Sequence, residues 1–239
     1  MWGEDEQHAS RLRREHPVIT DEQLARIVAI GAAGFEVATV PMLFKVAEAG
    51  DGMRSAVAEL CARVEAAVDA GANIIVISDR GVSPDLAPIP SLLAMGAVHH
   101  HLIREAKRTR CGIILETGEA REIGHFAMLI GYGANAVDPY LAFETVGDMV
   151  DDGAFTRRGL GREEAVENYI RAVEKGMLKI FAKMGISTLA SYQGAQIYEA
   201  VGLSSEVIDL AFGGTYSRIS GVGLDIVAKE ACMRYAKVL

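Results

Sequence analysis

The sequence predicts an α/β fold: an incomplete (β/α) barrel whose mostly parallel sheet is covered by helices. Two largely apolar runs, at residues 73–78 and 112–115, are typical of parallel strands buried on both faces. Segments with helical spacing alternate with such runs over short connections, which is the pattern of parallel sheets and barrels. We expect about five or six strands, fewer than the eight of a closed barrel. The sheet should therefore be open.

The first helices are indicated by caps and by apolar stripes. Thr20-Asp21-Glu22-Gln23 resembles a capping box and predicts a helix to about residue 30. Residues 54–70 have helical spacing because Val57, Leu60, Val64 and Val68 fall on one stripe. Pro88 and Pro90 open the next helix, which we place at residues 91–107.

The remaining elements follow from similar local signals. We expect further strands at 35–40, 135–138 and 187–191, helices at 120–132, 142–149, 163–183, 193–201 and 224–238, and a strand or a helix at 207–211. Residues 151–161 are polar and contain glycine, so we expect an exposed excursion there. Residues 1–16 form a polar N-terminal segment, and residues 17–239 form the α/β domain.

Composition excludes several classes of protein. Half of the 239 residues are hydrophobic, enough for a sizeable core, and the net charge is −8. This acidic balance disfavours nucleic acid as a partner. No apolar run approaches the ~20 residues of a membrane span. The three cysteines are widely separated and form neither a disulfide framework nor a CxxC pair, so a reducing cytoplasm is expected.

Polar residues follow two of the predicted strands directly. Asp79 and Arg80 come after the strand at 73–78, and Glu116 follows the strand at 112–115. Parallel sheets and barrels build their sites at such strand ends. Asp79 is therefore a candidate ligand-binding or acid–base carboxylate. The structural alternative is a local pair of Asp79 with Arg80 that orders the following loop.

Three consecutive histidines, His99, His100 and His101, lie in a predicted helix. Consecutive helical residues point about 100° apart, so their rings do not converge on one metal ion. We expect one ring to be buried and hydrogen-bonded, one to line the sheet and one to be exposed. If one of them, such as His100, is functional, its partner would be Asp79 or Glu116.

The densest polar cluster runs from Glu116 to His125 and includes Arg121. Thr117 is placed to cap the following helix, and Glu119 or Glu122 would favour the N-terminus of that helix electrostatically. The alternative is that Glu116, Arg121 and His125 line a pocket or a domain interface.

Two further turns carry weaker signals. Gln193 follows a predicted strand, and either it or Gln196 is a candidate contact for a ligand amide, with helix capping as the structural alternative. Gly213-Gly214-Thr215, before Arg218, would offer backbone N–H groups to an anion, yet it lacks the G-x-G-x-x-G and Walker A patterns. The sequence also lacks G-x-S-x-G and H-E-x-x-H. Composition and spacing alone identify no reaction.

Long ordered stretches of this sequence resemble one protein family. They are ANIIVISDRG at 72–81, APIPSLLAMGAVHHHLIREAKRTR at 87–110, ILETGEAREIGHFAMLIGYGANAVDPYLAFET at 114–145, YIRAVEKGMLKIFAKMGISTLASYQGAQIYEAVGL at 169–203 and FGGTYSRISGVGLDIVAKEA at 212–231. Together they resemble the large subunit of glutamate synthase, and within it the central domain. The resemblance extends over residues 8–231, and no single motif carries it.

This resemblance implies a place in ammonia assimilation. The family makes two glutamates from glutamine and 2-oxoglutarate, and ammonia passes through an internal tunnel from a glutaminase domain to an FMN barrel. The FMN barrel also holds a 3Fe–4S cluster, and NAD(P)H or ferredoxin supplies electrons. The central domain is a rudimentary relative of that barrel, links the glutaminase and FMN-binding domains, and contributes structure around the tunnel. These domains are the implied partners.

The expected role of this chain alone is structural. It begins Met1-Trp2 rather than with a nucleophilic cysteine, and its cysteines lack cluster spacing. We therefore expect no catalytic residue, no metal and no cofactor in this chain, and a tunnel or interface role for Asp79, Arg80, His100, Glu116, Arg121, His125, Gln193 and Arg218. A homo-oligomer is also expected, because an open barrel leaves sheet edges uncovered.

Two alternatives use the same residues differently. The chain is either a stand-alone barrel-like enzyme or binder, with Asp79, Glu116, Arg121 and His125 around one pocket, or an interaction module with exposed apolar faces. Convergence of these four side chains would favour the first alternative. A large exposed apolar patch would favour the second.

Overall fold

A four-stranded parallel sheet organises the computed structural model, which describes residues 12, 16–31, 34–155 and 159–236. The strands lie side by side in chain order, and every adjacent pair is parallel. They are β1 (Val37–Pro41), β3 (Ile74–Ser78), β5 (Gly112–Glu116) and β6 (Ala136–Asp138). Sequential order is the arrangement of (β/α) barrels, whereas the order of a doubly wound sheet reverses. The predicted α/β fold with an open, mostly parallel, helix-covered sheet is confirmed.

One face of this sheet is covered by the helices that connect its strands. These are α2 (Ala49–Asp69), α3 (Ser91–Arg104) and α4 (Ile123–Gly131). Alternate strand residues, such as Ile75, Leu115 and Val137, point into the main core beneath these helices. Connecting helices on one face, as here, form the outer layer of a closed barrel. The opposite face therefore corresponds to the interior of a barrel.

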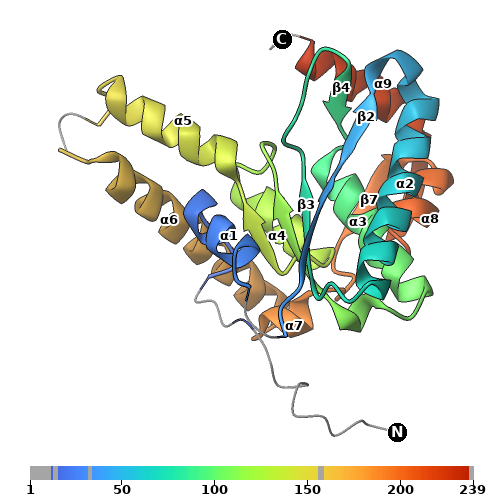
Figure 1. Cartoon of the computed structure of the whole chain (residues 1–239), viewed down its shortest axis with the longest axis horizontal. Helices are drawn as coiled ribbons and strands as arrows, with labels where there is room; N and C mark the ends of the chain where they lie inside the picture. The colour runs from blue at the N-terminus through green and yellow to red at the C-terminus, as the bar shows by residue number, and fades with distance from the viewer. Residues whose placement is uncertain (1–11, 13–15, 32–33, 156–158, 237–239) are drawn as a thin grey trace, which may run out of the picture.

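Helix α1 (Asp21–Val28) covers this interior-type face, and it lies in front of the sheet in Figure 1. A small second core forms there, in which Leu24 and Ile27 of α1 pack with Ile74, Val76, Ile114 and Ala136 of the sheet. The predicted capping box is present, since Thr20 and Gln23 each accept the backbone N–H of the other.

The segment before α1 pairs with the edge strand β6. The N–H of Ile19 donates to the Val137 carbonyl at 3.0 Å, and the N–H of Val137 donates to the Pro17 carbonyl at 2.8 Å. Val18 and Ile19 are both buried. This pairing protects one edge of the sheet and fixes where α1 begins.

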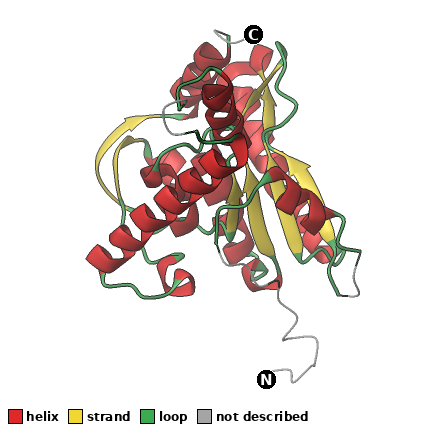
Figure 2. Ribbon diagram, turned by 90° about the vertical axis from the view of Figure 1, so that its left-hand side faces the viewer, coloured by secondary structure: helices red, strands yellow, loops and turns green. Residues whose placement is uncertain are grey.

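The rest of the chain surrounds the sheet. It comprises β2 (Leu43–Lys45), β4 (Leu86–Pro88), α5 (Tyr140–Asp151), α6 (Arg162–Met184), α7 (Leu189–Tyr192), β7 (Glu199–Leu203), α8 (Ser205–Ala211), β8 (Tyr216–Val222) and α9 (Leu224–Tyr235), with short 3₁₀ turns at Val46–Glu48 and Arg108–Arg110. Strands β2 and β4 pair antiparallel, and β7 and β8 pair parallel. Figure 2 shows the β7–β8 pair curving away from the main sheet.

Two predicted elements are wrong. Residues 187–191 were expected to form a strand, but Thr188 accepts the N–H of Ser191 at 3.2 Å and so caps the short helix α7. Residues 193–201 were expected to form a helix. Gly194 and Gln196 have positive φ angles of 74° and 52°, which interrupt a helix, and the segment continues into β7.

Other elements are present with different bounds. Helix α2 begins at Ala49 rather than at residue 54, because Gly50 and Gly52 weaken the helical signal in its first turn. The element at 207–211, left open as strand or helix, is α8. Part of the excursion at 151–161 and nearly all of the segment at 1–16 lie outside the described residues. The described helices include none that is both long and apolar enough to cross a membrane.

Candidate functional site

The polar strand ends of the sheet meet on the face that α1 covers. Side chains alternate along a strand, so Glu116 shares a face with Ile114, and Asp138 shares a face with Ala136. Asp21, the first residue of α1, lies over the same end of the sheet. In a barrel this position is the interior at the carboxyl ends of the strands, where active sites form.

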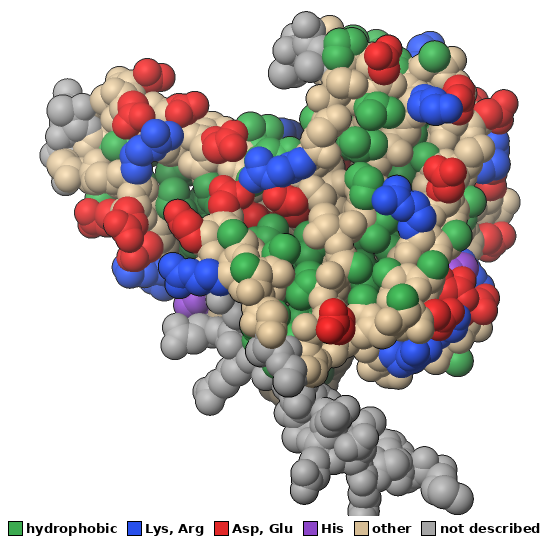
Figure 3. Space-filling view, in the orientation of Figure 1, with side chains coloured by type: hydrophobic (Ala, Val, Ile, Leu, Met, Phe, Trp, Pro, Cys, Tyr) green, Lys and Arg blue, Asp and Glu red, His purple; other side chains and the backbone are tan. Residues whose placement is uncertain are grey.

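Arg80 connects these carboxylates. Its guanidinium pairs with Asp21, with 2.5 Å between Nη2 and Oδ1, and its Nε donates to Glu116. The same guanidinium lies over the ring of Tyr140, 3.9 Å from the ring centroid. In Figure 3 the surface is hollowed beside α5, and basic and acidic side chains lie together in this hollow. Arg80 therefore links β3, α1, β5 and the start of α5.

Asp138 is the most unusual group of this cluster. Its side chain is fully buried, and neither carboxyl oxygen has a hydrogen-bond partner among the described residues. Burial, assisted by the negative charges of Asp21 and Glu116, raises the pKa of Asp138 to about 8. A carboxyl held this way is neutral at pH 7 unless a cation binds beside it.

Asp79 belongs to a separate hydrogen-bond network. Its Oδ2 accepts the Thr117 hydroxyl at 2.7 Å and the Gly118 N–H at 2.8 Å. The Ser91 hydroxyl lies 2.6 Å from that of Thr117, so the network joins the end of β3 to the start of α3. Burial raises the pKa of Asp79. Its partners are internal, which suits an ordering role better than contact with a ligand.

Two local predictions about these residues are wrong. The expected pair of Asp79 with Arg80 is replaced by pairs of Arg80 with Asp21 and Glu116, because Asp79 points into its own buried network. Thr117 was expected to cap the following helix. Instead Glu122 is the N-cap of α4, and His125 accepts the N–H of Glu122 in return.

Sequence reasoning missed Asp21 and Asp138. Asp138 was placed correctly at the end of a strand, directly before Pro139, and this signal was the same as for Asp79 and Glu116. Asp21 was visible only as part of a capping box. The pairing of residues 17–19 with β6, which brings Asp21 to the strand ends, is a long-range contact that no local pattern indicates.

The three histidines have three separate environments. His99 is buried, and its Nδ1 accepts Arg108 Nε at 3.0 Å. The ring nitrogens of His100 lie 2.9 Å from the carbonyl oxygens of Gly96 and Gly213, and His101 lies 2.8 Å from Glu65. Within the described residues, His100 therefore bonds to backbone carbonyl oxygens rather than to Asp79 or Glu116.

Arg121 and His125 lie at the N-terminus of α4. The ring of His125 accepts the backbone N–H groups of Arg121 and Glu122 at 3.3 and 3.4 Å. Arg121 lines an open depression with Ile123 and Tyr169. The lining residues of this depression include neither Asp79 nor Glu116.

Gln193 and Arg218 are placed elsewhere. Gln193 donates to the Ala134 carbonyl at 2.7 Å and thereby anchors the chain after α7. Arg218 lies on β8 and is exposed, 3.8 Å from Glu199.

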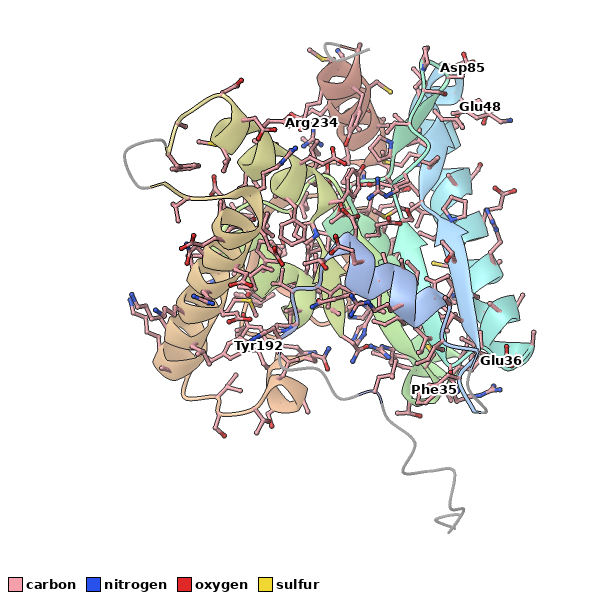
Figure 4. The ribbon with its side chains drawn as sticks, turned by 60° about the vertical axis from the view of Figure 1, so that its left-hand side comes forward. Phe35, Glu36, Glu48, Asp85, Tyr192 and Arg234 are labelled. Carbon is pink, nitrogen blue, oxygen red and sulfur yellow. The ribbon has the colours of Figure 1, made fainter. Side chains whose placement is uncertain are left out.

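A pocket of about 350 Å³ is lined by Gly213, Gly214 and Thr215 together with Tyr192 and Tyr198. Figure 4 shows Tyr192 and Arg234 near opposite ends of the molecule.

The two buried cysteines, Cys61 and Cys111, are poor nucleophiles. Burial raises the pKa of Cys61 to about 11 and also raises that of Cys111, so thiolate is scarce at neutral pH. The cluster of Asp21, Glu116 and Asp138 offers oxygen ligands and a protonated carboxyl. It contains neither a nucleophile nor a base aligned on one.

Comparison with known proteins identifies relatives of this chain. A family model described as "Glutamate synthase central domain" matches residues 1–204. The large chain of the NADPH glutamate synthase of Bacillus subtilis is 40% identical over 230 residues, which cover 96% of this chain and 15% of that protein. The ferredoxin-dependent glutamate synthase of Pyropia yezoensis is 40% identical over 240 residues, with the same coverage of 96% and 15%. The chain thus spans 15% of the length of these relatives.

Solved structures give weaker similarities. The flavin-binding domain of baker's yeast flavocytochrome b2 aligns with 68% of this chain and 40% of its own, at 15% identity and a TM-score of 0.44. The DHODH of Eimeria tenella in complex with ferulenol aligns with 59% of this chain and 35% of its own, at 16% identity and a TM-score of 0.39. Because both TM-scores are below 0.5, the fold class is assigned from the parallel sheet of this chain and not from these two structures.

Proposed function

Because this chain belongs to the glutamate synthase central-domain family, we propose that it is a structural domain of a glutamate synthase rather than an independent enzyme. In this proposal the chain joins a glutaminase domain to an FMN-binding domain and helps to wall the ammonia passage between them. Glutamate is then formed from glutamine and 2-oxoglutarate by the neighbouring domains.

One observation favours a structural role over a catalytic role for this chain. The face of the sheet that corresponds to a barrel interior is filled by α1, and Arg80 occupies the strand-end position with its carboxylate partners. A substrate or a flavin would have to displace α1 to reach that position. The sequential order of the parallel strands supports a relation to the FMN barrel of the same enzyme, as part of the proposal.

The β7–β8 pair supports contacts with other domains. Val201, Tyr216 and Ile219 are each about 60% exposed or more, and Val222 and Ile226 nearby are also exposed. Apolar side chains gathered on one projecting element favour an interface over open solvent. We place the contact with the rest of the enzyme on this pair of strands. The expected homo-oligomer stays a prediction.

Cofactors are assigned to the other domains. We infer that FMN, the 3Fe–4S cluster and the NAD(P)H or ferredoxin site lie outside this chain. The absorbance spectrum of the purified chain, recorded after incubation with FMN and gel filtration, should show no flavin band. Retained flavin in stoichiometric amount would overturn this assignment.

The function is tested with the chain alone and in a chimera. The purified chain should neither hydrolyse glutamine nor form glutamate from glutamine and 2-oxoglutarate with a reduced electron donor. A Bacillus subtilis large chain whose matching segment is replaced by this chain should form glutamate. Glutamine-dependent glutamate formation by the isolated chain would show that the structural assignment is wrong.

A further inference from the structure

Three carboxylates from distant parts of the chain converge at the carboxyl end of the sheet. Asp21 comes from the first turn of α1, Glu116 from the end of β5 and Asp138 from the end of β6. One oxygen from each of them lies within 4.8 Å of the other two. This spacing suits oxygen ligands around one ion, because Ca²⁺–oxygen distances are about 2.3–2.6 Å and Mg²⁺–oxygen distances are about 2.0–2.1 Å.

Asp138 gives a second and independent reason to expect a ligand. Its side chain has no solvent exposure, and both of its oxygens lack a hydrogen-bond partner among the described residues. Buried polar groups are nearly always satisfied, and an unpaired one costs about 1–3 kcal/mol. A cation between the three carboxylates would satisfy Asp138, and so would a proton shared with the adjacent Asp21.

The charge balance favours a divalent cation over a shared proton alone. Arg80 contributes one positive charge against three carboxylates, so two negative charges remain when all three are ionised. The side chains of Arg80 and Asp21 are 44% and 47% exposed. An ion can therefore approach from the α1 side, while Asp138 forms the buried floor of the site.

We propose that Asp21, Glu116 and Asp138 bind one divalent cation of the oxygen-preferring class, such as Mg²⁺, Mn²⁺ or Ca²⁺. Carboxylates without thiolate or imidazole ligands select this class. Arg80 stays beside the ion and holds Asp21 and Glu116 in place, and water completes the coordination. The ion would fasten α1 to the ends of β5 and β6.

The test uses the full chain and Mn²⁺ as the probe. After treatment with EDTA and its removal, Mn²⁺ is titrated at pH 8.5 and free Mn²⁺ is followed by electron paramagnetic resonance. This pH is chosen because Asp138, whose pKa is raised to about 8, is then largely ionised. One Mn²⁺ should bind per chain, and excess Mg²⁺ or Ca²⁺ should displace it.

The variants distinguish binding of Mn²⁺ at these three carboxylates from nonspecific attraction of the cation to an acidic protein. Asp138→Asn and Asp21→Asn should each weaken Mn²⁺ binding at least tenfold, since even partners of metal ligands often contribute 10–100-fold. Asp21 is half exposed, so the second variant remains interpretable if Asp138→Asn fails to fold. Asp209→Asn, at an exposed position on α8, should bind like the wild type.

Two outcomes would overturn the proposal. The first is no stoichiometric Mn²⁺ binding by the wild-type chain at millimolar concentration, which would leave the shared proton as the means of satisfying Asp138. The second is equal affinity in the wild type, Asp21→Asn and Asp209→Asn, which would show that binding is not at these carboxylates.

Discussion

At the scale of single residues, His99 has the clearest link between burial and pH. Its ring is buried beside the Arg108 guanidinium, and burial first and Arg108 second lower the pKa of His99 to about 4. The unfolded chain binds a proton at this ring below pH ~6.5. Between pH ~6.5 and ~4 the unfolded state therefore carries more protons, and the native state loses stability as pH falls.

His99→Gln should reduce the loss of native-state stability at low pH. Glutamine keeps an oxygen that can accept Arg108 Nε but does not titrate. Urea unfolding at pH 7.0, 5.5 and 4.5 should show a free energy of unfolding that falls less in His99→Gln than in the wild type. The difference should approach about 2–3 kcal/mol, since each pKa unit corresponds to about 1.4 kcal/mol. The same slope in both proteins would mean that the pKa of His99 is not lowered by folding.

At the scale of elements, the contact between α3 and α8 depends on a glycine. A Cβ at Gly96 would overlap the carbonyl oxygen of Ala211, the last residue of α8, and would press on the Phe212 ring. Backbone atoms cannot turn aside as a side chain does, so the two helices would have to separate.

Gly96→Ala should therefore lower the free energy of unfolding by about 2 kcal/mol or more, despite the better helix propensity of alanine. Gly124→Ala is the matched control, because Gly124 is also helical and a Cβ there would meet nothing within 4 Å. The control should be neutral or stabilised by up to ~1 kcal/mol. Thermal or urea unfolding measures both, and equal effects would contradict close packing of α3 on α8.

Elements differ in how well local sequence specifies them. β3 and β5 were predicted because a fully buried parallel strand is a continuous apolar run. β7 and β8 were not predicted, since neither strand contains a buried residue and β8 is almost entirely exposed. In addition, Gly221 packs directly on the Gly202 backbone. The same holds for the site. Strand-end Asp79 and Glu116 could be predicted from local sequence, whereas Asp21 comes close to Glu116 only through the long-range pairing of residue 18 with residue 137.

At the scale of the whole molecule, the sheet separates two cores of unequal size. The core under α2, α3 and α4 is large, while the core under α1 contains Leu24, Ile27 and a few strand residues. A helix of 8 residues is not stable alone in water. We therefore expect α1 to open in a local step that costs less free energy than global unfolding.

Hydrogen exchange followed by mass spectrometry tests this hierarchy. Amides of α1 should exchange faster than those of β3 and β5, and Leu24→Ala should speed exchange in α1 far more than in the strands, because it weakens only the small core. Leu60→Ala is the control, since Leu60 is buried in the large core and its loss should speed exchange in the strands as well. If Leu24→Ala speeds exchange in β5 as much as in α1, the two cores unfold as one unit. If α1 opens separately, a cation bound at Asp21 should oppose that opening. Added Mn²⁺ should then slow hydrogen exchange in α1 while leaving exchange in β3 unchanged.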